Sequence, residues 1–469
     1  MRDDLTLVLD IGKSHAKLLF IDDAGEVVER HGRDNHGVAA SLGYRALDVD
    51  GLAAWITRTL RGSAATRRCR RAIASTHGAA FVALGDDGLA WAPLDYEDDG
   101  VDALHAAYQR ERDPFETTLS PDLPLGLNAA RQLHWLQHTH PEAWARTRLL
   151  LPYPQYWAWW LSGVAASEVS SLGCHTQLWQ PRTGGYAPMA TRLGWAHRFA
   201  PLRPAWQVLG RVQPPQARSL GLPEDCEVVC GVHDSNACLA RYLDGSSSMT
   251  LVSSGTWVVV MAPGGTARSL DPSRDELANV SVRGDVVPTA RFMGGREVAA
   301  LCDGADPASA TLGRAAALDA RGIVAMPSFA AQGGPYAGRT GQVLRAGRPI
   351  DAAALAPADR ATLAAVYAAQ LTAQLLESLG APAPVVLEGP FADNPVLVHV
   401  LAALLPEGAL HTSADPVEGT ARGAWQLARR DAAGPYAPLL RAVAAPADAA
   451  RWRDRQARWT AALAAPLTS

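Results

Sequence analysis

Residues 5–21 most constrain the fold, because they predict a strand, a tight turn and a returning strand with charged groups held at the turn. Leu5 to Leu9 is apolar except for Thr6, which is typical of a strand buried on both faces. Asp10 follows this strand directly, and Gly12 allows a close backbone approach in the turn. Lys17 to Ile21 is expected to return as the second strand.

The turn Gly12-Lys-Ser-His15 offers successive backbone N–H groups, which can form an anion site. Asp10 would repel a bare phosphate, so a cation is needed between the carboxylate and the phosphate. Mg²⁺ fits, because it binds through one or two carboxylates together with phosphate oxygens. An ordinary hairpin with a polar tip remains the alternative. The stretch predicts Asp10 as a metal ligand, with nucleotide contacts from Asp10, Gly12, Lys13, Ser14, His15 and Lys17.

The use of lysine supports a function for this turn. Lys13 and Lys17 are the only lysines among 43 Lys and Arg residues. Lysine is a compact point charge on a flexible stem, whereas arginine is a planar fork. A lysine here would suit a phosphate oxygen or the Asp10 carboxylate.

Length and composition limit the classes of protein. A chain of 469 residues predicts two domains. The net charge of −4 argues against a nucleic acid or an anionic membrane as partner, and no apolar run reaches membrane-spanning length. The six scattered cysteines form no C-x-x-C pair, and the start of the chain leaves no room for a signal peptide. A cytoplasmic protein is expected.

A second copy of the strand–turn–strand pattern begins at Thr250. The segment Thr250-Leu-Val-Ser-Ser-Gly-Thr-Trp resembles Thr6-Leu-Val-Leu-Asp-Ile-Gly-Lys, with Ser253 in place of Asp10 when the glycines are aligned. This predicts an internal duplication, with domains at 1–245 and 246–469 and the boundary in Asp244-Gly-Ser-Ser-Ser248. Gly255 and Thr256 then form the second phosphate turn.

Other candidates lie where strands end. His77 and Gly78 follow the strand Ala72–Ser75 and are candidates to line a substrate pocket, although a satisfied loop histidine is equally compatible with the sequence. The strand Pro384–Glu388 runs into Gly389, and Asn394 begins the next helix. A strand that ends in glycine before a helix N-terminus is a suitable nucleotide platform.

Asp234 lies at a strand-to-helix junction, after the mostly apolar run Cys226–Val232. It could simply cap the helix, which is a common role for Asp. Alternatively, it could act as a general base held at a cleft. His233 beside it could hydrogen-bond a sugar, and Ser235 completes the candidate substrate-binding segment.

The order of these motifs resembles the FGGY family of carbohydrate kinases over nearly the whole chain. Asp10-Ile-Gly-Lys-Ser-His-Ala-Lys17 and Ser253-Ser-Gly-Thr-Trp257 are similar to the two phosphate motifs. Gly231-Val-His-Asp-Ser-Asn-Ala-Cys238 is similar to the segment with the catalytic aspartate. Glu388-Gly-Pro-Phe-Ala-Asp-Asn394 and Glu418-Gly-Thr-Ala-Arg-Gly423 lie where the adenosine region falls.

The resemblance implies a two-domain α/β protein with the actin-like, ribonuclease-H-like ATPase fold. Each domain would be a mixed sheet flanked by helices, with the active site in the interdomain cleft. It also implies that Asp234 takes a proton from a primary hydroxyl of a ketose, which then attacks the γ-phosphorus of MgATP. Within the family, His233-Asp234 and Ser253–Trp257 look most like L-rhamnulose kinases, followed by L-fuculose kinases.

The chain departs from the family pattern at Gly389-Pro-Phe391, where consecutive glycines are common, and around His77 and Asp95. A 6-deoxy-ketohexose such as L-rhamnulose or L-fuculose is expected as substrate, with xylulose, ribulose or a glycerol-like polyol as alternatives. A non-catalytic actin-like ATPase or sugar sensor is the alternative of another class. Oligomeric state is not readable from the sequence, and a homodimer is left open.

Overall fold

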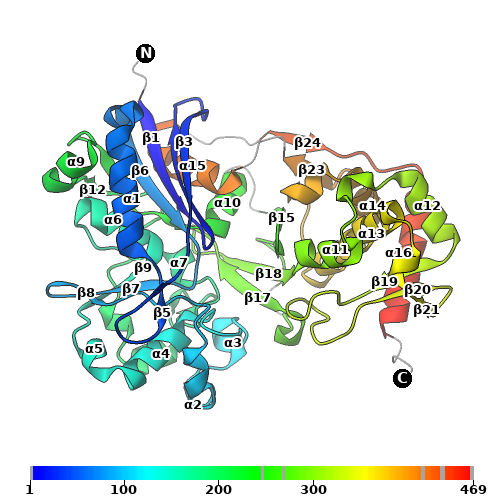
Figure 1. Cartoon of the computed structure of the whole chain (residues 1–469), viewed down its shortest axis with the longest axis horizontal. Helices are drawn as coiled ribbons and strands as arrows, with labels where there is room; N and C mark the ends of the chain where they lie inside the picture. The colour runs from blue at the N-terminus through cyan, green and yellow to red at the C-terminus, as the bar shows by residue number, and fades with distance from the viewer. Residues whose placement is uncertain (1–3, 244–247, 267–269, 414–417, 434–438, 465–469) are drawn as a thin grey trace. The chain divides into compact units, whose positions relative to one another are not determined.

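The computed structural model describes residues 4–243, 248–266, 270–413, 418–433 and 439–464. The chain divides into two compact units, each built around a seven-stranded sheet (Figure 1). The first unit holds residues 1–245, 278–286 and 418–437, and the second holds the remainder. A single division after residue 245 was expected, so the return of 418–437 to the first unit is a difference. Residues 244–247, where the boundary was expected, lie outside the described residues.

The first sheet has the order β12-β13-β6-β1-β2-β3, and β14 also pairs with β6. Strands β1, β2 and β3 are antiparallel, whereas β6 runs parallel to β1. β13 and β14 both run parallel to β6. The strands are β1 (Leu5–Ile11), β2 (His15–Ile21), β3 (Val27–Asp34), β6 (Cys69–Thr76), β12 (Val208–Arg211), β13 (Glu227–Val229) and β14 (Val232–His233).

Helices cover both faces of this sheet. Leu5, Leu7 and Leu9 of β1 share a core cluster with Leu52 and Ile56 of α1 (Val49–Gly62), and Figure 1 shows α1 lying across the sheet. α15 (Gly419–Ala433) contacts β1 and β6 and packs against α10 (Asp234–Leu243). A strand covered on both faces is mostly apolar, as the sequence of β1 predicted.

A smaller layer of the first unit surrounds the sheet β8-β7-β9. Its own core cluster includes Trp135, Trp144 and Trp195. Its main elements are β7 (Phe81–Gly85), β8 (Gly88–Trp91), β9 (Leu149–Pro152), α2 (His105–Glu111), α4 (Ala129–Thr139) and α5 (Pro141–Ala145). The aromatic segment after Pro152 forms α6 (Tyr153–Ser162), which ends at Gly163 in a left-handed conformation; its rings are largely core, as expected.

The second sheet has the order β17-β18-β16-β15-β22-β23-β24. Its strands are β15 (Thr250–Ser254), β16 (Val258–Met261), β17 (Glu276–Val280), β18 (Val286–Phe292), β22 (Val385–Glu388), β23 (Leu410–Ser413) and β24 (Leu440–Ala442). The second unit's core is formed with α11 (Gly294–Cys302), α12 (Leu312–Ala320), α13 (Pro357–Ser378), α14 (Pro395–Leu404) and α16 (Ala449–Ala464). β15 is antiparallel to β16 and parallel to β22, which repeats the arrangement of β1, β2 and β6.

Within the described residues, no helix is both long enough and apolar enough to cross a bilayer.

Candidate active site

The register of the first sheet brings three predicted segments to one edge. Asp10 and Ile11 pair with Ser75 and Thr76 of β6. Val232 and His233 of β14 pair with the same two residues from the other side. Asp10 is the penultimate residue of β1, whereas His77 and Asp234 directly follow β6 and β14. Because these parallel strands end at the same edge of the sheet, all three residues lie at the edge where α/β sheets bind ligands.

Asp10 is buried to the extent that only 14% of its side chain is exposed. Burial raises the pKa of Asp10 to about 6, opposed by the charge of Lys17 and reinforced by the charge of Asp234. Lys17 Nζ lies 4.0 Å from Asp10 Oδ2 and 3.9 Å from Glu418 Oε1. An ionised Asp10 beside Asp234 is therefore under-compensated, and a bound cation would relieve this repulsion. The site fits Mg²⁺ in its donor chemistry.

The turn after Asp10 is closed by backbone hydrogen bonds. Gly12 N donates to His15 O over 2.9 Å, and Asn35 Nδ2 donates to Gly12 O over 2.8 Å. Ser14 and His15 are exposed, and His15 Nε2 lies 3.4 Å from Asp34 Oδ1. The predicted turn is therefore present, with its tip open to solvent.

Lys13 pairs with Asp95 and Glu97 rather than with Asp10. Its Nζ lies 2.8 Å from Asp95 Oδ2 and 3.1 Å from Glu97 Oε2, and 5.4 Å from the ring centroid of Tyr96. Asp95 is fully buried and also pairs with Arg45 over 2.9 Å. Lys17, rather than Lys13, is thus the lysine next to Asp10. The residues 95–97 were missed as partners because they lie about eighty positions away in sequence.

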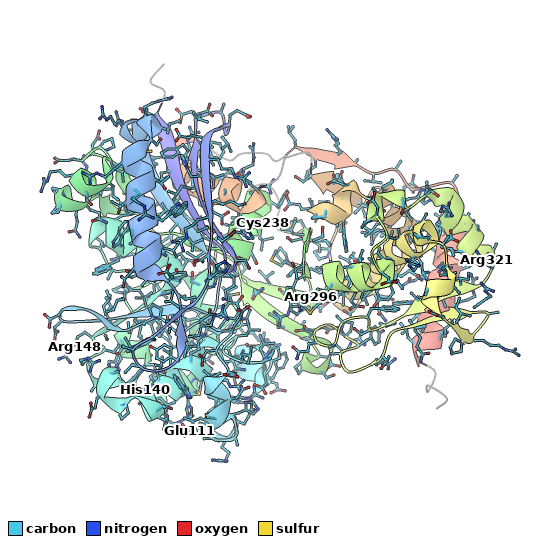
Figure 2. The ribbon with its side chains drawn as sticks, viewed as in Figure 1. Glu111, His140, Arg148, Cys238, Arg296 and Arg321 are labelled. Carbon is cyan, nitrogen blue, oxygen red and sulfur yellow. The ribbon has the colours of Figure 1, made fainter. Side chains whose placement is uncertain are left out.

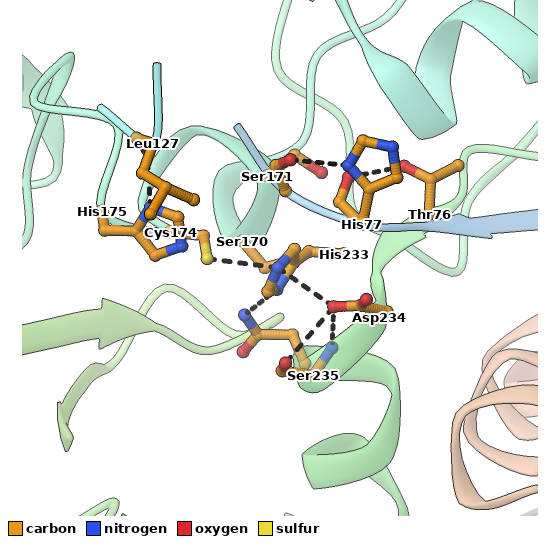
Figure 3. Close-up of polar contacts among 12 residues, drawn as sticks. Thr76, His77, Leu127, Ser170, Ser171, Cys174, His175, His233, Asp234 and Ser235 are labelled. Atoms are coloured by element: carbon orange, nitrogen blue, oxygen red, sulfur yellow. Dashed lines mark hydrogen bonds and ion pairs between the residues drawn. The ribbon is translucent and has the colours of Figure 1, made fainter. Parts of the chain in front are cut away.

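The predicted base is held by a polar network (Figure 3). Asp234 Oδ1 accepts from Ser235 N at 2.6 Å and lies 3.1 Å from His233 Nε2. Asn236 Nδ2 donates to His233 Nδ1 over 3.2 Å, so the proton of the neutral ring lies on Nε2, which is also 3.1 Å from Cys174 Sγ. Burial lowers the pKa of His233, which keeps the imidazole neutral. A helix-capping side chain accepts from an N–H two or three residues further on, whereas Asp234 accepts from the next residue.

His77 and Gly78 lie against this network. A Cβ on Gly78 would lie 2.9 Å from His233 Nε2 and 3.3 Å from Cys174 Sγ, so only glycine fits there without a shift. His77 Nδ1 donates to Gly78 O over 2.9 Å, while its buried Nε2 has no hydrogen-bond partner among the described residues. Burial lowers the pKa of His77 and favours the neutral ring. A buried nitrogen with an unused lone pair can accept from a ligand hydroxyl.

The second unit contains a cavity of about 500 Å³ at the carboxyl ends of β15 and β22. Ser254 Oγ accepts from Phe391 N over 3.0 Å and joins the two strand ends. Gly389 has φ +79°, and a Cβ there would lie 2.0 Å from Ser254 O, so this position requires glycine. The lining residues are Gly255, Thr256, Gly295, Arg296, Val298, Ala299, Pro307, Ala361, Ala365, Pro390, Phe391, Asn394 and Leu397.

Three predicted residues, Gly255, Thr256 and Asn394, line this cavity, whereas Gly389 shapes its wall from behind. Asn394 Oδ1 accepts from Val396 N and Leu397 N and so caps α14 as well. Arg296, exposed in the first turn of α11, is a lining residue that the sequence reasoning missed (Figure 2). The strand that runs into Gly294-Gly295 before a helix was the available signal.

Glu418, expected in the adenosine region, belongs to the first unit. Arg30 Nη1 lies 3.0 Å from Glu418 Oε1, and Lys17 connects Glu418 to Asp10. A Cβ on Gly423 would lie 1.8 Å from Ala237 O, so the glycine sets the close approach of α15 to α10. α10 begins at Asp234, so α15 supports the element that positions the predicted base.

Comparisons with known proteins match two family models to successive parts of the chain. Residues 123–240 match the N-terminal domain model of the FGGY family of carbohydrate kinases, and residues 246–436 match the model described as carbohydrate kinase FGGY, C-terminal domain. A solved carbohydrate kinase from Novosphingobium aromaticivorans is 35% identical, with 99% of each chain covered and a TM-score of 0.88. The chain belongs to the FGGY family of carbohydrate kinases.

More distant relatives agree in fold. Plasmodium falciparum glycerol kinase, solved with ADP, is 11% identical, with 99% of each chain covered and a TM-score of 0.78. L-fuculokinase from Salmonella typhi is 24% identical over 274 residues, and the alignment spans 56% of this chain and 58% of that protein. The predicted two-domain FGGY fold, with two mixed sheets flanked by helices, is confirmed.

Proposed function

We propose that the protein transfers the γ-phosphate of MgATP to the primary hydroxyl of a ketose. The observation that carries this proposal is the arrangement of Asp10, His77 and His233-Asp234 at the carboxyl ends of three adjacent strands. Phosphoryl transfer requires a metal-binding carboxylate, a base and a positioned acceptor, and this edge of the sheet offers all three. Family membership and the likeness to carbohydrate kinases support the same chemistry.

Asp234 is the proposed base. Neutral His233, whose Nε2 lies 3.1 Å from Asp234 Oδ1, would help to hold the carboxylate in place. Asp234 also begins α10, and the positive end of the helix dipole favours the negative charge. The unpartnered Nε2 of His77 would accept a hydroxyl of the acceptor sugar.

Asp10 would hold Mg²⁺, whose charge would neutralise the phosphate oxygens. Lys17 would compensate the negative charge that remains. We assign the adenosine moiety to the cavity lined by Gly255, Thr256 and Asn394, since its volume and mainly apolar walls suit a flat heterocycle. Arg296 and the N-terminus of α11 would meet its phosphates. Lys13 would position Asp95, with which it pairs over 2.8 Å.

For the acceptor, we propose a 6-deoxy-ketohexose such as L-rhamnulose or L-fuculose. The motif around His233-Asp234 supports this choice, and so does the partial match to a protein named L-fuculokinase. Xylulose-like ketoses and polyols are the competing acceptors of the same reaction.

The test is a screen of ketoses, deoxyketoses and polyols with MgATP, repeated with Asp234→Asn. We expect one deoxyketose to give the highest kcat/KM, and Asp234→Asn to lower kcat roughly 10²–10⁴-fold with an unchanged melting temperature. A pentulose or glycerol preferred by about tenfold, or about 1.4 kcal/mol of transition-state stabilisation, would refute the sugar but not the kinase. An Asn variant that folds and keeps most of its kcat would refute Asp234 as base.

A further inference from the structure

Three side chains of the smaller layer in the first unit bring metal-ligating atoms together. His134 and His138 are four residues apart on α4, so both lie on one face of the helix. Glu111 is the last residue of α2, which packs on α4. One ligand atom from each of the three lies within 4.8 Å of the others. Figure 2 labels Glu111 in this region, together with His140 just beyond the end of α4.

His134 is the unusual member of the cluster. Its side chain is only 1% exposed, yet neither ring nitrogen has a hydrogen-bond partner among the described residues. Its Nε2 lies 3.8 Å from Glu111 Oε1, which is too long for a hydrogen bond. Buried polar groups nearly always have a partner, so this ring indicates a ligand that the protein atoms do not supply.

His138 is prepared as a ligand by its backbone contact. Its Nδ1–H donates to the carbonyl oxygen of His134 over 2.8 Å, which leaves Nε2 unprotonated and able to coordinate. The two imidazole rings lie 4.2 Å apart between centroids. Neutral imidazoles are the form that binds metals.

We propose that Glu111, His134 and His138 bind one divalent transition-metal ion of the Zn²⁺ class. Tetrahedral Zn²⁺ with bonds of about 2.0 Å places its ligands about 3.3 Å apart, so small side-chain rotations would close the site. Glu111 and His138 are partly or fully exposed, which gives the ion an entry path and leaves a fourth position for water. Two imidazoles favour zinc, cobalt, nickel or copper over magnesium.

This site is independent of the proposed kinase chemistry. Its three ligands come from α2 and α4, whereas Asp10 lies near the end of β1 and Asp234 directly follows β14. The ion would link α2 to α4 and stabilise the layer around β7.

The experiment is calorimetric titration of the chelator-treated full chain with ZnCl₂ in excess MgCl₂. We expect one Zn²⁺ per chain, an affinity at least about tenfold weaker in His138→Gln and in Glu111→Gln, and no change in His197→Gln. His197 is also exposed, which makes it a matched control for His138. The melting temperature should rise with ZnCl₂ in the wild type and His197→Gln but not in the two ligand variants.

Two results would overturn the proposal. One is no heat from ZnCl₂ with the wild type. The other is binding that His138→Gln and Glu111→Gln both leave unchanged, which would place the ion elsewhere, for example at one of the six buried cysteines. Because both substituted side chains are at least partly exposed, the variants should fold, and a melting curve without metal checks this.

Discussion

The turn after β1 and the turn after β15 occupy the same place in two sheets of the same topology, yet they carry different chemistry. In each sheet, the strand before the turn is antiparallel to the next strand and parallel to a later one. In the first turn, Asp10 pairs across the strands with Lys17. In the second, Ser253 pairs with Val259. The carboxylate and its opposing cation are thus absent together from the second turn.

The surroundings of the two turns also differ in polarity. The first is followed at the same sheet edge by His77 and by His233-Asp234. The second opens on a mostly apolar cavity and is held by Gly295, whose N–H donates to Thr256 O over 3.2 Å. The same backbone unit therefore carries charged groups in one sheet and opens on a mostly apolar cavity in the other. This difference depends on the residue near the end of the strand, Asp10 or Ser253, and on the residues at the ends of the neighbouring strands.

The largest expected effect comes from replacing the two aligned residues, Asp10 and Ser253, one at a time. We expect Asp10→Asn to lower kcat at least about 10²-fold, because the metal would lose its carboxylate at the reacting phosphate. Ser253→Ala should stay within about tenfold of wild type. Steady-state kinetics with saturating MgATP and the preferred sugar measure both. Equal losses in the two variants would show that the second turn also handles charge.

The buried Asp10 should also lower the free energy of unfolding at neutral pH, whereas Ser253 should have no such effect. The folded pKa of Asp10, about 6, is above the ordinary value of 3.8, so the folded state binds more protons between these values. Stability therefore falls as pH rises from about 4 to about 6, by at most about 3 kcal/mol. Without Mg²⁺, Asp10→Asn should thus raise the unfolding free energy at pH 7.5, and the gain should vanish near pH 4.

Denaturant titrations at the two pH values test this expectation. Asp87→Asn, at an exposed aspartate, is the control and should show no such pH-dependent gain. A lower unfolding free energy of Asp10→Asn at pH 7.5 would instead show that the attraction of Lys17 outweighs the cost of burying the charge of Asp10. Adding MgCl₂ should shrink the gain, since the ion stabilises only the ionised wild type.

Much of the fold followed from local pattern, whereas the partners of charged residues did not. The helix end at Gly163, the strand at Ile323–Met326 and the two strand–turn–strand units all follow from periodicity and turn residues. Lys13 instead pairs with Asp95 and Glu97. Such an ion pair depends on how distant segments pack, which no local pattern encodes.

The assignment of α15 shows the same limit. Its glycine-rich start looked like part of a nucleotide platform, and its place next to α10 depends on the contact of Gly423 with Ala237. The cavity was foreseen only in part for the same reason. Gly255, Thr256 and Asn394 come after strand ends, whereas Ala361 and Ala365 reach the wall from the first half of the long α13.

A smaller effect is expected from the support of the second turn. A Cβ on Gly295 would lie 2.4 Å from Gly255 O and 3.1 Å from Thr256 Cα, so Gly295→Ala must push the turn away from α11. We expect a loss of about 2 kcal/mol in stability and weaker ATP binding. Gly313→Ala, in α12 where nothing lies near the added Cβ, is the matched control. Calorimetric titration with ATP and denaturant titration test this expectation. Unchanged ATP affinity and unchanged stability in Gly295→Ala would contradict it.

The smallest expected effect separates the two turn glycines themselves. A Cβ on Gly12 would lie 3.1 Å from His15 O, whereas the nearest atom to a Cβ on Gly255 is Trp257 O at 3.9 Å. Replacing glycine by alanine reduces the freedom of the unfolded chain and stabilises by about 0.4–1 kcal/mol where the backbone accepts it. Gly255→Ala should therefore gain stability, while the crowding at His15 should cancel the gain in Gly12→Ala. Because Gly255 lines the cavity, its variant should nevertheless bind ATP more weakly, so stability and affinity should move in opposite directions. A Gly255→Ala variant that is more stable and binds ATP as tightly as wild type would remove the second turn from the nucleotide site.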